Sequence, residues 1–457
     1  MKRMNRRDFL SRSGQGLAGA ALGSVVLTAA RPGKVLGANE KVTMALIGCG
    51  GRGRGVMAGM VKNGAQVAYV CDVNDRARAA AAKQFGDMQG RAPKQEIEMR
   101  KVFEDKSVDA VMISTPEHWH ALGTVWACQA GKDVYVEKNP SINIWEGRKM
   151  VEAARKYRRV VTSGFQNRSA PYGFSAREYI KSGKLGKVVH VKCFNLLGGR
   201  RWHGQADGQV PAGLDWDRWL GPAPKIPYNP GVHSMKGRGG WGSYWAYSGG
   251  LLADDASHVM DLARRALDDP DHPQAVYHMG GNQAFNSGRE TPEIQAITYD
   301  YGDFVMTCES GNCMAFMSKS GGDVRYHDKF PYWPQNSTRI EIYGTKRMMY
   351  LGRHGGGWQV FEGGAKVVDQ EYGYHPDREH QPNFLECVKS RKMPHGDIEE
   401  SHKSAVLVHM GNIAYRVGNQ RLRFNAKTER FIGNDAANTL VKFEGHYREP
   451  YTIPENV

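Results

Sequence analysis

Apolar runs of strand length alternate with amphipathic segments along the first third of the chain. The runs that predict strands are residues 42–47, 66–71, 108–114, 133–136 and 160–163. Apolar residues recur three and four positions apart in the segments that predict helices, one after Gly53 and others at 75–85, 118–130 and 144–157. A polar connection containing Gly and Pro follows residue 85. This alternation is typical of a doubly wound parallel sheet in an α/β fold, which we expect to close near residue 165.

The pattern changes beyond residue 165. Val188, His190, Lys192 and Phe194 begin longer stretches of alternating polarity, typical of an antiparallel sheet with one solvated face. An irregular stretch at 198–250 is rich in Gly, Trp, Pro and Tyr, and a stretch of this length inside a domain is more often a functional loop than a linker. After about residue 375 the pattern is again largely helical. We therefore expect a second domain of α+β type.

Glycines follow the first strand at a spacing that suits a phosphate-binding turn. The motif Gly48-x-Gly50-x-x-Gly53 joins the strand to the next amphipathic segment, and Asp72 ends the second strand 19 residues later. Glycines at these places permit a sharp turn, close approach of a pyrophosphate and tight packing of helix on strand. The helix N-terminus favours the phosphates, and a carboxylate at Asp72 suits an adenosine ribose. The pattern predicts a dinucleotide site with NAD favoured and NADP as the alternative, since Arg76 lies near Asp72 in sequence.

The first 38 residues are not predicted to be part of the fold. They carry seven basic residues and one acid, and residues 5–10 (NRRDFL) form a twin-arginine pattern before a weakly apolar run at 14–30. That run has too many glycines and alanines for a convincing membrane span. We expect a twin-arginine signal peptide with a short linker, cleaved after Ala30 or Ala38, and a periplasmic or otherwise extracytoplasmic protein. A retained helix or anchor is the alternative.

The net charge and the cysteines do not indicate a nucleic-acid partner or a disulfide-bonded fold. The chain has a formal net charge of +15, but outside the first 38 residues its basic residues are mixed with acids and form no nucleic-acid footprint. Seven scattered cysteines do not suggest a disulfide framework.

Taken together, several motifs resemble the Gfo/Idh/MocA oxidoreductases. They are Gly48–Gly53, Asp72, Thr115-Pro116-x-x-x-His120, Glu137-Lys138 and Asp254-x-x-x-His258-x-x-Asp261. Segments 214–222, 383–387 and 447–451 resemble the exported branch of that family. The chain departs from the family pattern at Asn139, where proline is usual, and at Ala256, where glycine is usual.

The resemblance implies an N-terminal Rossmann domain at 39–165 that binds NAD or NADP. It implies a substrate and oligomerisation domain at 166–457, with an open, mostly antiparallel sheet and C-terminal helices that pack back toward the Rossmann domain. The expected cofactor-binding residues are Gly48, Gly50, Gly51, Arg52, Gly53, Asp72, Thr115, Pro116, His120, Glu137 and Lys138. We expect a sugar or polyol as the substrate, a homo-oligomer, no nucleic-acid partner and no stable membrane insertion after signal removal.

Three residues are the expected catalytic groups. Lys138 ends a parallel strand, where ligands gather, and beside an oxidised nicotinamide it would act as a base or an oxyanion donor. Asp254 and His258 are four apart, so on a helix they share a face. His258 suits general acid–base work near neutral pH, and Asp254 would orient a hydroxyl or tune Lys138. Asp261 is expected to be structural.

Two further features have competing interpretations. His118 and His120 are spaced like a metal pair, but no third ligand accompanies them, and His120 is expected to line the cofactor cleft instead. An aromatic and basic set would suit a carbohydrate or equally anchor the loop; its members are Arg200, Arg201, Trp202, His203, Trp241, Tyr244 and Trp245.

The sequence therefore predicts an exported NAD(P)-dependent oxidoreductase that acts on CH–OH groups of sugars or polyols. Because free nicotinamide is absent outside the cytoplasm, we expect a tightly held nucleotide that is oxidised and reduced in one cycle. A first alternative is a glycoside hydrolase or lyase that oxidises C3 transiently and then eliminates the aglycone. A second is a non-catalytic sugar-binding protein.

Overall fold

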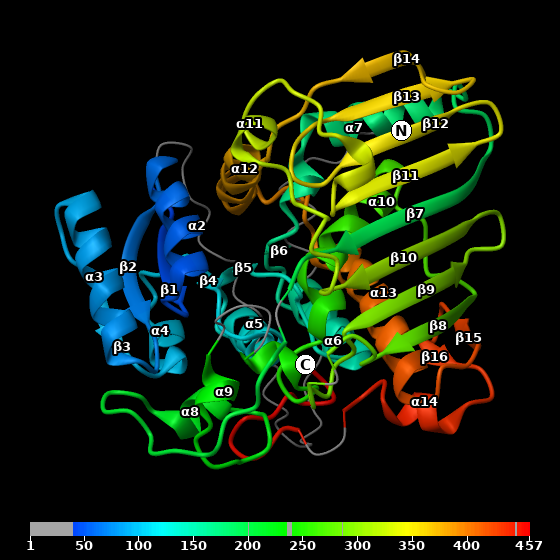
Figure 1. Cartoon of the computed structure of the whole chain (residues 1–457). Coiled ribbons are helices and arrows are strands. Elements are labelled where there is room, and N and C mark those ends of the chain that lie inside the picture. The colour runs from blue at the N-terminus through cyan, green and yellow to red at the C-terminus, as the bar shows by residue number, and fades with distance from the viewer. Residues whose placement is uncertain (1–39, 200, 235–239, 286, 444–445) are drawn as a thin grey trace, which may run out of the picture. The chain divides into compact units, whose positions relative to one another are not determined.

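The computed structural model describes residues 40–199, 201–234, 240–285, 287–443 and 446–457 (Figure 1). These residues all belong to one compact unit of the chain. The predicted signal segment at 1–38 and the loop residue Arg200 lie outside them. In this described part, no helix is both long and apolar enough to cross a membrane.

Six parallel strands form the first sheet, in the order β3-β2-β1-β4-β5-β6. Their bounds are β1 Thr43–Ile47, β2 Gln66–Cys71, β3 Lys94–Glu96, β4 Ala110–Ile113, β5 Asp133–Val136 and β6 Val161–Ser163. The connecting helices are α2 Gly51–Lys62, α3 Asp75–Gln89, α4 Met99–Glu104, α5 His120–Gln129 after the 3₁₀ turn Glu117–Trp119, and α6 Ile144–Lys156. The strand order reverses between β1 and β4. The loops that leave their carboxyl ends therefore diverge, which is where such sheets bind ligands.

The predicted polar connection after residue 85 contains two elements that the pattern did not reveal. Strand β3 is Lys94-Gln95-Glu96 at the sheet edge, where two of its three side chains are exposed, so no apolar run marks it. Helix α4 is only six residues long and buries Met99, Val102 and Phe103. An edge strand and a one-and-a-half-turn helix are too short for periodicity to reveal.

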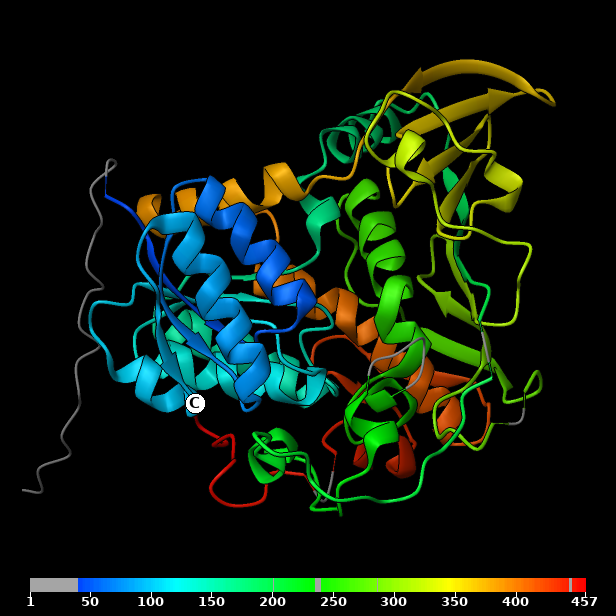
Figure 2. The same ribbon diagram turned by 60° about the vertical axis from the view of Figure 1, so that its left-hand side comes forward.

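Helices cover both faces of the parallel sheet. Residues of α2 and α3 share a hydrophobic cluster with Phe384 and Leu385 of α12 (Asp377–Ser390). Both views place α12 beside α2 (Figures 1 and 2). On the other face, α4, α5 and α6 form a cluster with Tyr451, whose ring packs edge-on against Trp119 with centroids 5.3 Å apart. C-terminal segments thus complete both sides of the first sheet.

Ten strands form the second sheet, in the order β14-β13-β12-β11-β7-β10-β9-β8-β15-β16. Neighbours pair antiparallel except β7 and β10, which are parallel. The bounds are β7 Val188–Leu196, β8 Ala275–Gly281, β9 Ile294–Asp300, β10 Val305–Gly311, β11 Arg339–Gly344, β12 Met348–Gly352, β13 Trp358–Glu362, β14 Lys366–Glu371, β15 Leu422–Asn425 and β16 Arg430–Phe431. The predicted fold class, a parallel Rossmann sheet with a second, mostly antiparallel sheet, is confirmed.

One face of the second sheet is covered by α7 (Pro171–Lys181), α10 (Ser257–Ala266) and α13 (Ile398–Arg416). Alternate residues of the central strands, such as Ile297 and Tyr299 of β9, point into this core. Their neighbours face the opposite side of the sheet, and Tyr277 and Met279 of β8 are exposed there. The alternating polarity in the sequence reflects this one-sided burial.

Within the irregular stretch at 198–250, the described residues form only short elements. They are α8 Trp216–Leu220, α9 Pro230–His233 and a 3₁₀ turn at Gly240–Ser243. Their apolar residues form a small separate cluster around Trp216 and Trp219, whose rings stack 4.6 Å apart. The chain after residue 375 is less helical than expected, because β15 and β16 follow α13 before the short helix α14 (Asp435–Thr439).

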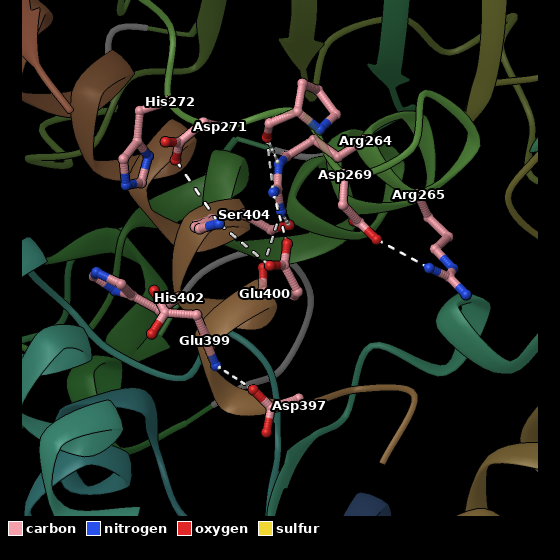
Figure 3. A network of polar contacts seen from close by, with 12 residues as sticks. Arg264, Arg265, Asp269, Asp271, His272, Asp397, Glu399, Glu400, His402 and Ser404 are labelled. Carbon is pink, nitrogen blue, oxygen red and sulfur yellow. Dashed lines mark hydrogen bonds and ion pairs between the residues drawn. The ribbon is translucent and has the colours of Figure 1, made fainter. Parts of the chain in front are cut away.

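A buried polar network fastens α10 to α13 (Figure 3). Arg264 of α10 donates to the Glu400 carboxylate (Nη2–Oε2 2.9 Å) and to the Ser404 hydroxyl (2.8 Å). One turn earlier, Asp261 accepts from Arg168 (Nε–Oδ1 2.7 Å) and from Ser404 (2.7 Å). Arg168 and Asp261 are both completely enclosed. Asp261 therefore anchors α10 through these buried contacts.

Candidate active site

The glycine turn between β1 and α2 has the geometry that its sequence predicts. Gly48 has φ +89°, and a Cβ there would lie 2.6 Å from the Ser114 carbonyl. A Cβ on Gly53 would lie 2.4 Å from the Gly48 carbonyl oxygen. By contrast, nothing lies within 4 Å of the position a Cβ on Gly50 would take. Gly50 caps α2 without a side chain, so the first N–H groups of the helix face open space, as a bound pyrophosphate requires.

Asp72 lies at the end of β2, where the ribose carboxylate was expected. Its Oδ2 accepts from the Cys49 amide (2.6 Å) and its Oδ1 from the Asn74 amide (2.8 Å). Burial raises the pKa of Asp72, although these hydrogen bonds oppose the rise. Arg76 is exposed and does not line the cavity that lies next to Asp72. Arg78 is the arginine beside Asp72, because its Nη1 donates to the Asp72 carbonyl (2.7 Å).

A cavity of about 600 Å³ runs along the carboxyl edge of the parallel sheet. All eleven residues predicted to bind the cofactor line it: Gly48, Gly50, Gly51, Arg52, Gly53, Asp72, Thr115, Pro116, His120, Glu137 and Lys138. The open cradle over Gly50 and the carboxylate of Asp72 fit a dinucleotide. When bound, NAD would accept or return a hydride at this edge.

The cavity is also lined by residues that were not among the expected cofactor-binding residues. The stretch at 198–250 supplies Arg218, Trp219 and His233, and Tyr451 comes from near the C-terminus. Within the set of aromatic and basic loop residues, Trp241 lines the cavity. Others of that set pack on the protein instead: Trp202 lies edge-on to Tyr244, and Trp245 packs on Tyr415. Arg201 and His203 are exposed.

Lys138 is the second residue after β5, and its peptide bond to Asn139 is cis. Its Nζ donates to Asp254 Oδ1 at 2.9 Å. Burial disfavours the ammonium, but Asp254, Asp255 and Glu117 outweigh burial and hold the pKa of Lys138 above its ordinary value. In the protein without its cofactor, these three acidic groups therefore favour the charged form of the amine.

Asp254 and His258 do not share the face of a regular helix. Residues 252–256 form a π-helical turn in which Asp254 is non-helical (φ −75°, ψ −123°), and α10 begins only at Ser257. The helical-face argument was wrong, yet both side chains line one hollow because the chain bends there. Ala256, where glycine is usual in the family, is fully buried at this bend.

His258 is almost completely buried, and its ring lies edge-on to Phe165 with centroids 5.5 Å apart. Its Nδ1 has no hydrogen-bond partner within the described part of the chain. Burial, together with the charges of Arg353 and Lys138, lowers the pKa of His258 well below 6.5. The imidazole is thus neutral near neutral pH, and a neutral ring can accept a hydrogen bond.

Glu117 is a buried carboxyl that the sequence analysis missed. It is 3% exposed, it lines the cavity, and it accepts from the Gly249 amide (Oε2 3.2 Å). Burial raises its pKa to about 7, although the charge of nearby Lys138 opposes the rise. Its position inside the segment Thr115–His120, which was expected to line the cofactor cleft, is the sequence feature that could have indicated it.

His118 and His120 are held by carbonyl groups. His118 Nε2 lies 3.0 Å from the Trp219 carbonyl. The His120 ring lies between the Thr115 and Asn139 carbonyls (2.9 and 2.8 Å), and a neutral ring can donate to one of them. Residues 40–457, apart from the undescribed gaps, contain no group of three His, Cys, Asp or Glu side chains arranged to hold a metal ion.

A second hollow, of about 370 Å³, opens beside the Lys138–Asp254 pair. It shares Arg52, Glu137, Lys138 and Asp254 with the larger cavity. Its other walls are Asp255, His258, Gln166 and polar residues from the segments 319–326, 353–354 and 375–377. Lys138 and Asp254 therefore stand between a dinucleotide-sized cavity and a polar hollow of the size of a small ligand.

Comparisons with known proteins agree with this geometry. The model of the Gfo/Idh/MocA oxidoreductase family, NAD-binding Rossmann fold, matches residues 42–165. The model of the C-terminal alpha/beta domain of the same family matches residues 175–328 and 341–453.

Individual relatives are distant. The scyllo-inositol 2-dehydrogenase (NAD(+)) of Bacillus subtilis is 23% identical over 303 residues, which are 64% of this chain and 71% of that protein. The levoglucosan dehydrogenase of Pseudarthrobacter phenanthrenivorans is 26% identical over 195 residues, 43% of this chain and 41% of that protein. A levoglucosan dehydrogenase solved with NADH and levoglucosan superposes with a TM-score of 0.61 at 17% identity, covering 84% of this chain and 99% of the other. Because the two family models together span most of the chain, it belongs to the Gfo/Idh/MocA family and is an NAD-binding oxidoreductase.

Proposed function

We propose that the protein transfers a hydride between a CH–OH carbon of a sugar or polyol and NAD, at the junction of the two cavities. One observation carries this proposal. The Lys138–Asp254 pair lines both the dinucleotide-sized cavity and the polar hollow, so a substrate in the hollow lies beside the nicotinamide end. The relatives named above act on an inositol and on levoglucosan, which supports a polyol or sugar substrate.

Lys138, His258 and Asp254 would each have a different role in oxidation of the alcohol. The carbinol carbon gives its hydride to the cofactor, and the hydroxyl proton passes to a protein base. The Lys138 ammonium would bind the hydroxyl oxygen and stabilise the developing alkoxide. The neutral imidazole of His258 would take the proton, and Asp254 holds the amine in place at 2.9 Å. In carbonyl reduction the same groups act in reverse.

Incubation of the purified protein with a panel of sugars and polyols tests this proposal. Bound nucleotide is released by denaturation and identified by mass spectrometry, before and after each substrate is added. We expect NAD to become NADH with at least one member of the panel. Lys138→Ala should abolish that change, whereas Lys83→Ala, on an exposed helix face, should leave it intact. Aryl glycosides in the panel report the alternative chemistry, since release of the aglycone without net reduction of NAD would point to transient oxidation and elimination.

We further propose that the protein is exported by the twin-arginine pathway and holds its nucleotide tightly in the periplasm. The pattern at residues 5–10 supports the export. Retention of the cofactor is supported by Arg218, Trp219 and Tyr451, which line the same cavity as the glycine turn. Cell fractionation of wild-type protein and of a variant with Arg6 and Arg7 both changed to Lys tests the export. Retention of the variant in the cytoplasm is expected, and equal export of both would contradict the proposal.

We also propose that the protein forms a homo-oligomer through the uncovered face of the second sheet, as expected for this domain. Tyr277 and Met279 of β8 and Val305 of β10 are exposed apolar side chains on this sheet. Light scattering of the wild type and of Met279→Lys tests this, and an unchanged mass of one chain for both proteins would refute it.

A further inference from the structure

The polar hollow beside Lys138 contains an unusual density of charge. Five cationic side chains line it: Arg52, Lys138, Lys319, Arg325 and Arg353. Four carboxylates also line it: Glu137, Asp254, Asp255 and Asp377. Burying an unpaired charge costs free energy unless an opposite charge lies beside it. The charged groups that lack a partner within the protein therefore indicate which charge a bound ligand would carry.

Each carboxylate has a cationic side chain or a histidine within 4 Å, although Asp377 Oδ1 is buried without a hydrogen-bond partner. Glu137 accepts from Arg52 (2.9 Å) and Asp254 from Lys138 (2.9 Å). Asp255 pairs with Lys319. Asp377 Oδ2 lies 3.4 Å from His375 Nδ1 and its Oδ1 lies 3.9 Å from Arg52.

His375 is neutral, which keeps it from supplying a further charge. Its Nε2 accepts from Arg353 Nη1 (3.1 Å), so the proton of the ring is on Nδ1, where it faces Asp377. Burial lowers the pKa of His375, in agreement with this tautomer.

Two guanidinium groups remain incompletely paired. Arg353 is 4% exposed, its Nε has no partner, and its closest carboxylate oxygen is Asp255 Oδ1 at 3.8 Å from Nη2. The Nε of Arg325 is also buried without a partner, and among the described residues Arg325 makes no ion pair. Both arginines line the hollow on walls contributed by the second domain, whereas Lys138 belongs to the first.

We propose that the substrate is a sugar acid, whose carboxylate binds Arg325 and Arg353 while its reacting CH–OH group lies at Lys138. This inference rests on the proposed function and specifies the substrate class of that site. A guanidinium fork matches a planar carboxylate, and these hydrogen bonds are charge-assisted. The hollow is lined by five cationic side chains and four carboxylates, so its side chains carry one net positive charge. A ligand with one carboxylate would neutralise that charge, whereas a dianionic phosphate would leave a net negative charge.

Matched pairs of neutral and acidic sugars test the inference: D-glucose with D-glucuronate, D-galactose with D-galacturonate, and D-glucitol with D-gluconate. For each pair the single-turnover reduction of bound NAD is followed at several sugar concentrations. These rates give an apparent kcat/KM for each sugar, and the value for the acid is divided by the value for the neutral sugar. We expect the acid to be preferred in at least one pair. Arg325→Gln should lower that ratio about 10- to 100-fold, mainly through KM, the range expected for a charge-assisted contact. Arg325→Lys, which keeps the charge, should restore part of it.

Arg421→Gln is the matched control, because Arg421 pairs with Asp300 at an exposed position and does not line the hollow. It should leave the ratio unchanged. A preference for the neutral sugar in every pair, a ratio that Arg325→Gln does not alter, or a stronger response to a sugar phosphate would each overturn the inference. If no member of any pair reduces NAD, the proposed function fails instead. Calorimetric binding of D-glucuronate to wild type and Arg325→Gln then decides the inference, and it fails if the two bind equally or not at all.

Discussion

Glu117 and Glu146 are two enclosed carboxyl groups with similar electrostatics and different surroundings. Burial raises the pKa of each from 4.5 to about 7. Glu117 lies in the cofactor cavity near Lys138, whereas Glu146 lies at the start of α6, where it accepts from the Tyr447 hydroxyl (2.7 Å). A change at Glu117 should therefore alter both the stability of the protein and the chemistry in the cavity. A change at Glu146 should alter stability alone.

Between pH 4.5 and 7 the folded protein keeps the proton on Glu117 while the unfolded chain has lost it. The free energy of unfolding therefore falls as the pH rises through this window, by up to about 3 kcal/mol for each such group. We expect Glu117→Gln and Glu146→Gln each to flatten this dependence in denaturant titrations of the nucleotide-free protein. Only Glu117→Gln should also change the pH profile of hydride transfer. A change of that profile in both variants, or in neither, would contradict a role for Glu117 beside Lys138.

Substitutions at two glycines of the turn should affect different properties, one the stability of the fold and the other the affinity for NAD. In Gly53→Ala the new Cβ meets the Gly48 carbonyl at 2.4 Å, so we expect a loss of about 1–3 kcal/mol in the free energy of unfolding. In Gly50→Ala the Cβ enters only the open cavity, so the fold should persist while NAD affinity falls at least about tenfold. Gly55→Ala is the control in the same helix, because its Cβ meets nothing and α2 should gain slightly in stability. Chemical denaturation and NADH fluorescence titration measure the two effects.

At the scale of elements, α10 determines where Asp254 and His258 lie. The helix begins after the bend at Asp254, and the Arg168–Asp261 pair holds its first turns against the turn η2 (Gln166–Ser169). This pair lies away from both cavities, so it supports the site without lining it.

Asp261→Ala should be strongly destabilising, by about 3–5 kcal/mol, because it leaves the Arg168 guanidinium buried without its main partner. Asp87→Ala, which breaks the exposed Lys83–Asp87 pair, should leave the unfolding midpoint unchanged. Urea unfolding of the two variants makes the comparison. Equal midpoints for Asp261→Ala and the wild type would show that Asp261 does not anchor α10.

At the scale of the whole described molecule, the cofactor cavity joins distant parts of the chain. Gly50 and Asp72 line it from the first sheet, Trp219 from the loop stretch, Asp254 from the second domain and Tyr451 from near the C-terminus. A ligand that contacts all of these segments binds the folded state alone.

NADH should therefore stabilise the nucleotide-stripped protein as one unit, by about 2.7 kcal/mol at a free concentration one hundred times Kd. Differential scanning calorimetry should show a single transition that moves to higher temperature with NADH. Gly50→Ala should shift much less at the same NADH concentration. A transition that splits, with only one part responding to NADH, would mean that the two domains unfold independently.

Much of the first domain could be predicted from the amino-acid sequence. Local periodicity is enough to predict strands and helices that pack on near neighbours, and the spacing of Gly48, Gly50, Gly53 and Asp72 reports a turn whose geometry is local. The position of Lys138 at a strand end follows from the same periodicity. The family resemblance extended these predictions to Asp254 and His258 and to the NAD-binding activity.

The protonation and surroundings of those residues depend on contacts that form only in the folded chain. The bend at Asp254, the ammonium form of Lys138, the neutral ring of His258 and the raised pKa of Glu117 arise from burial and from charges far away in sequence. The polar hollow likewise exists only because residues near 138, 254, 325, 353 and 377 meet in space. Electrostatic energy depends on distances in the folded chain, and the spacing of residues along the sequence does not contain those distances.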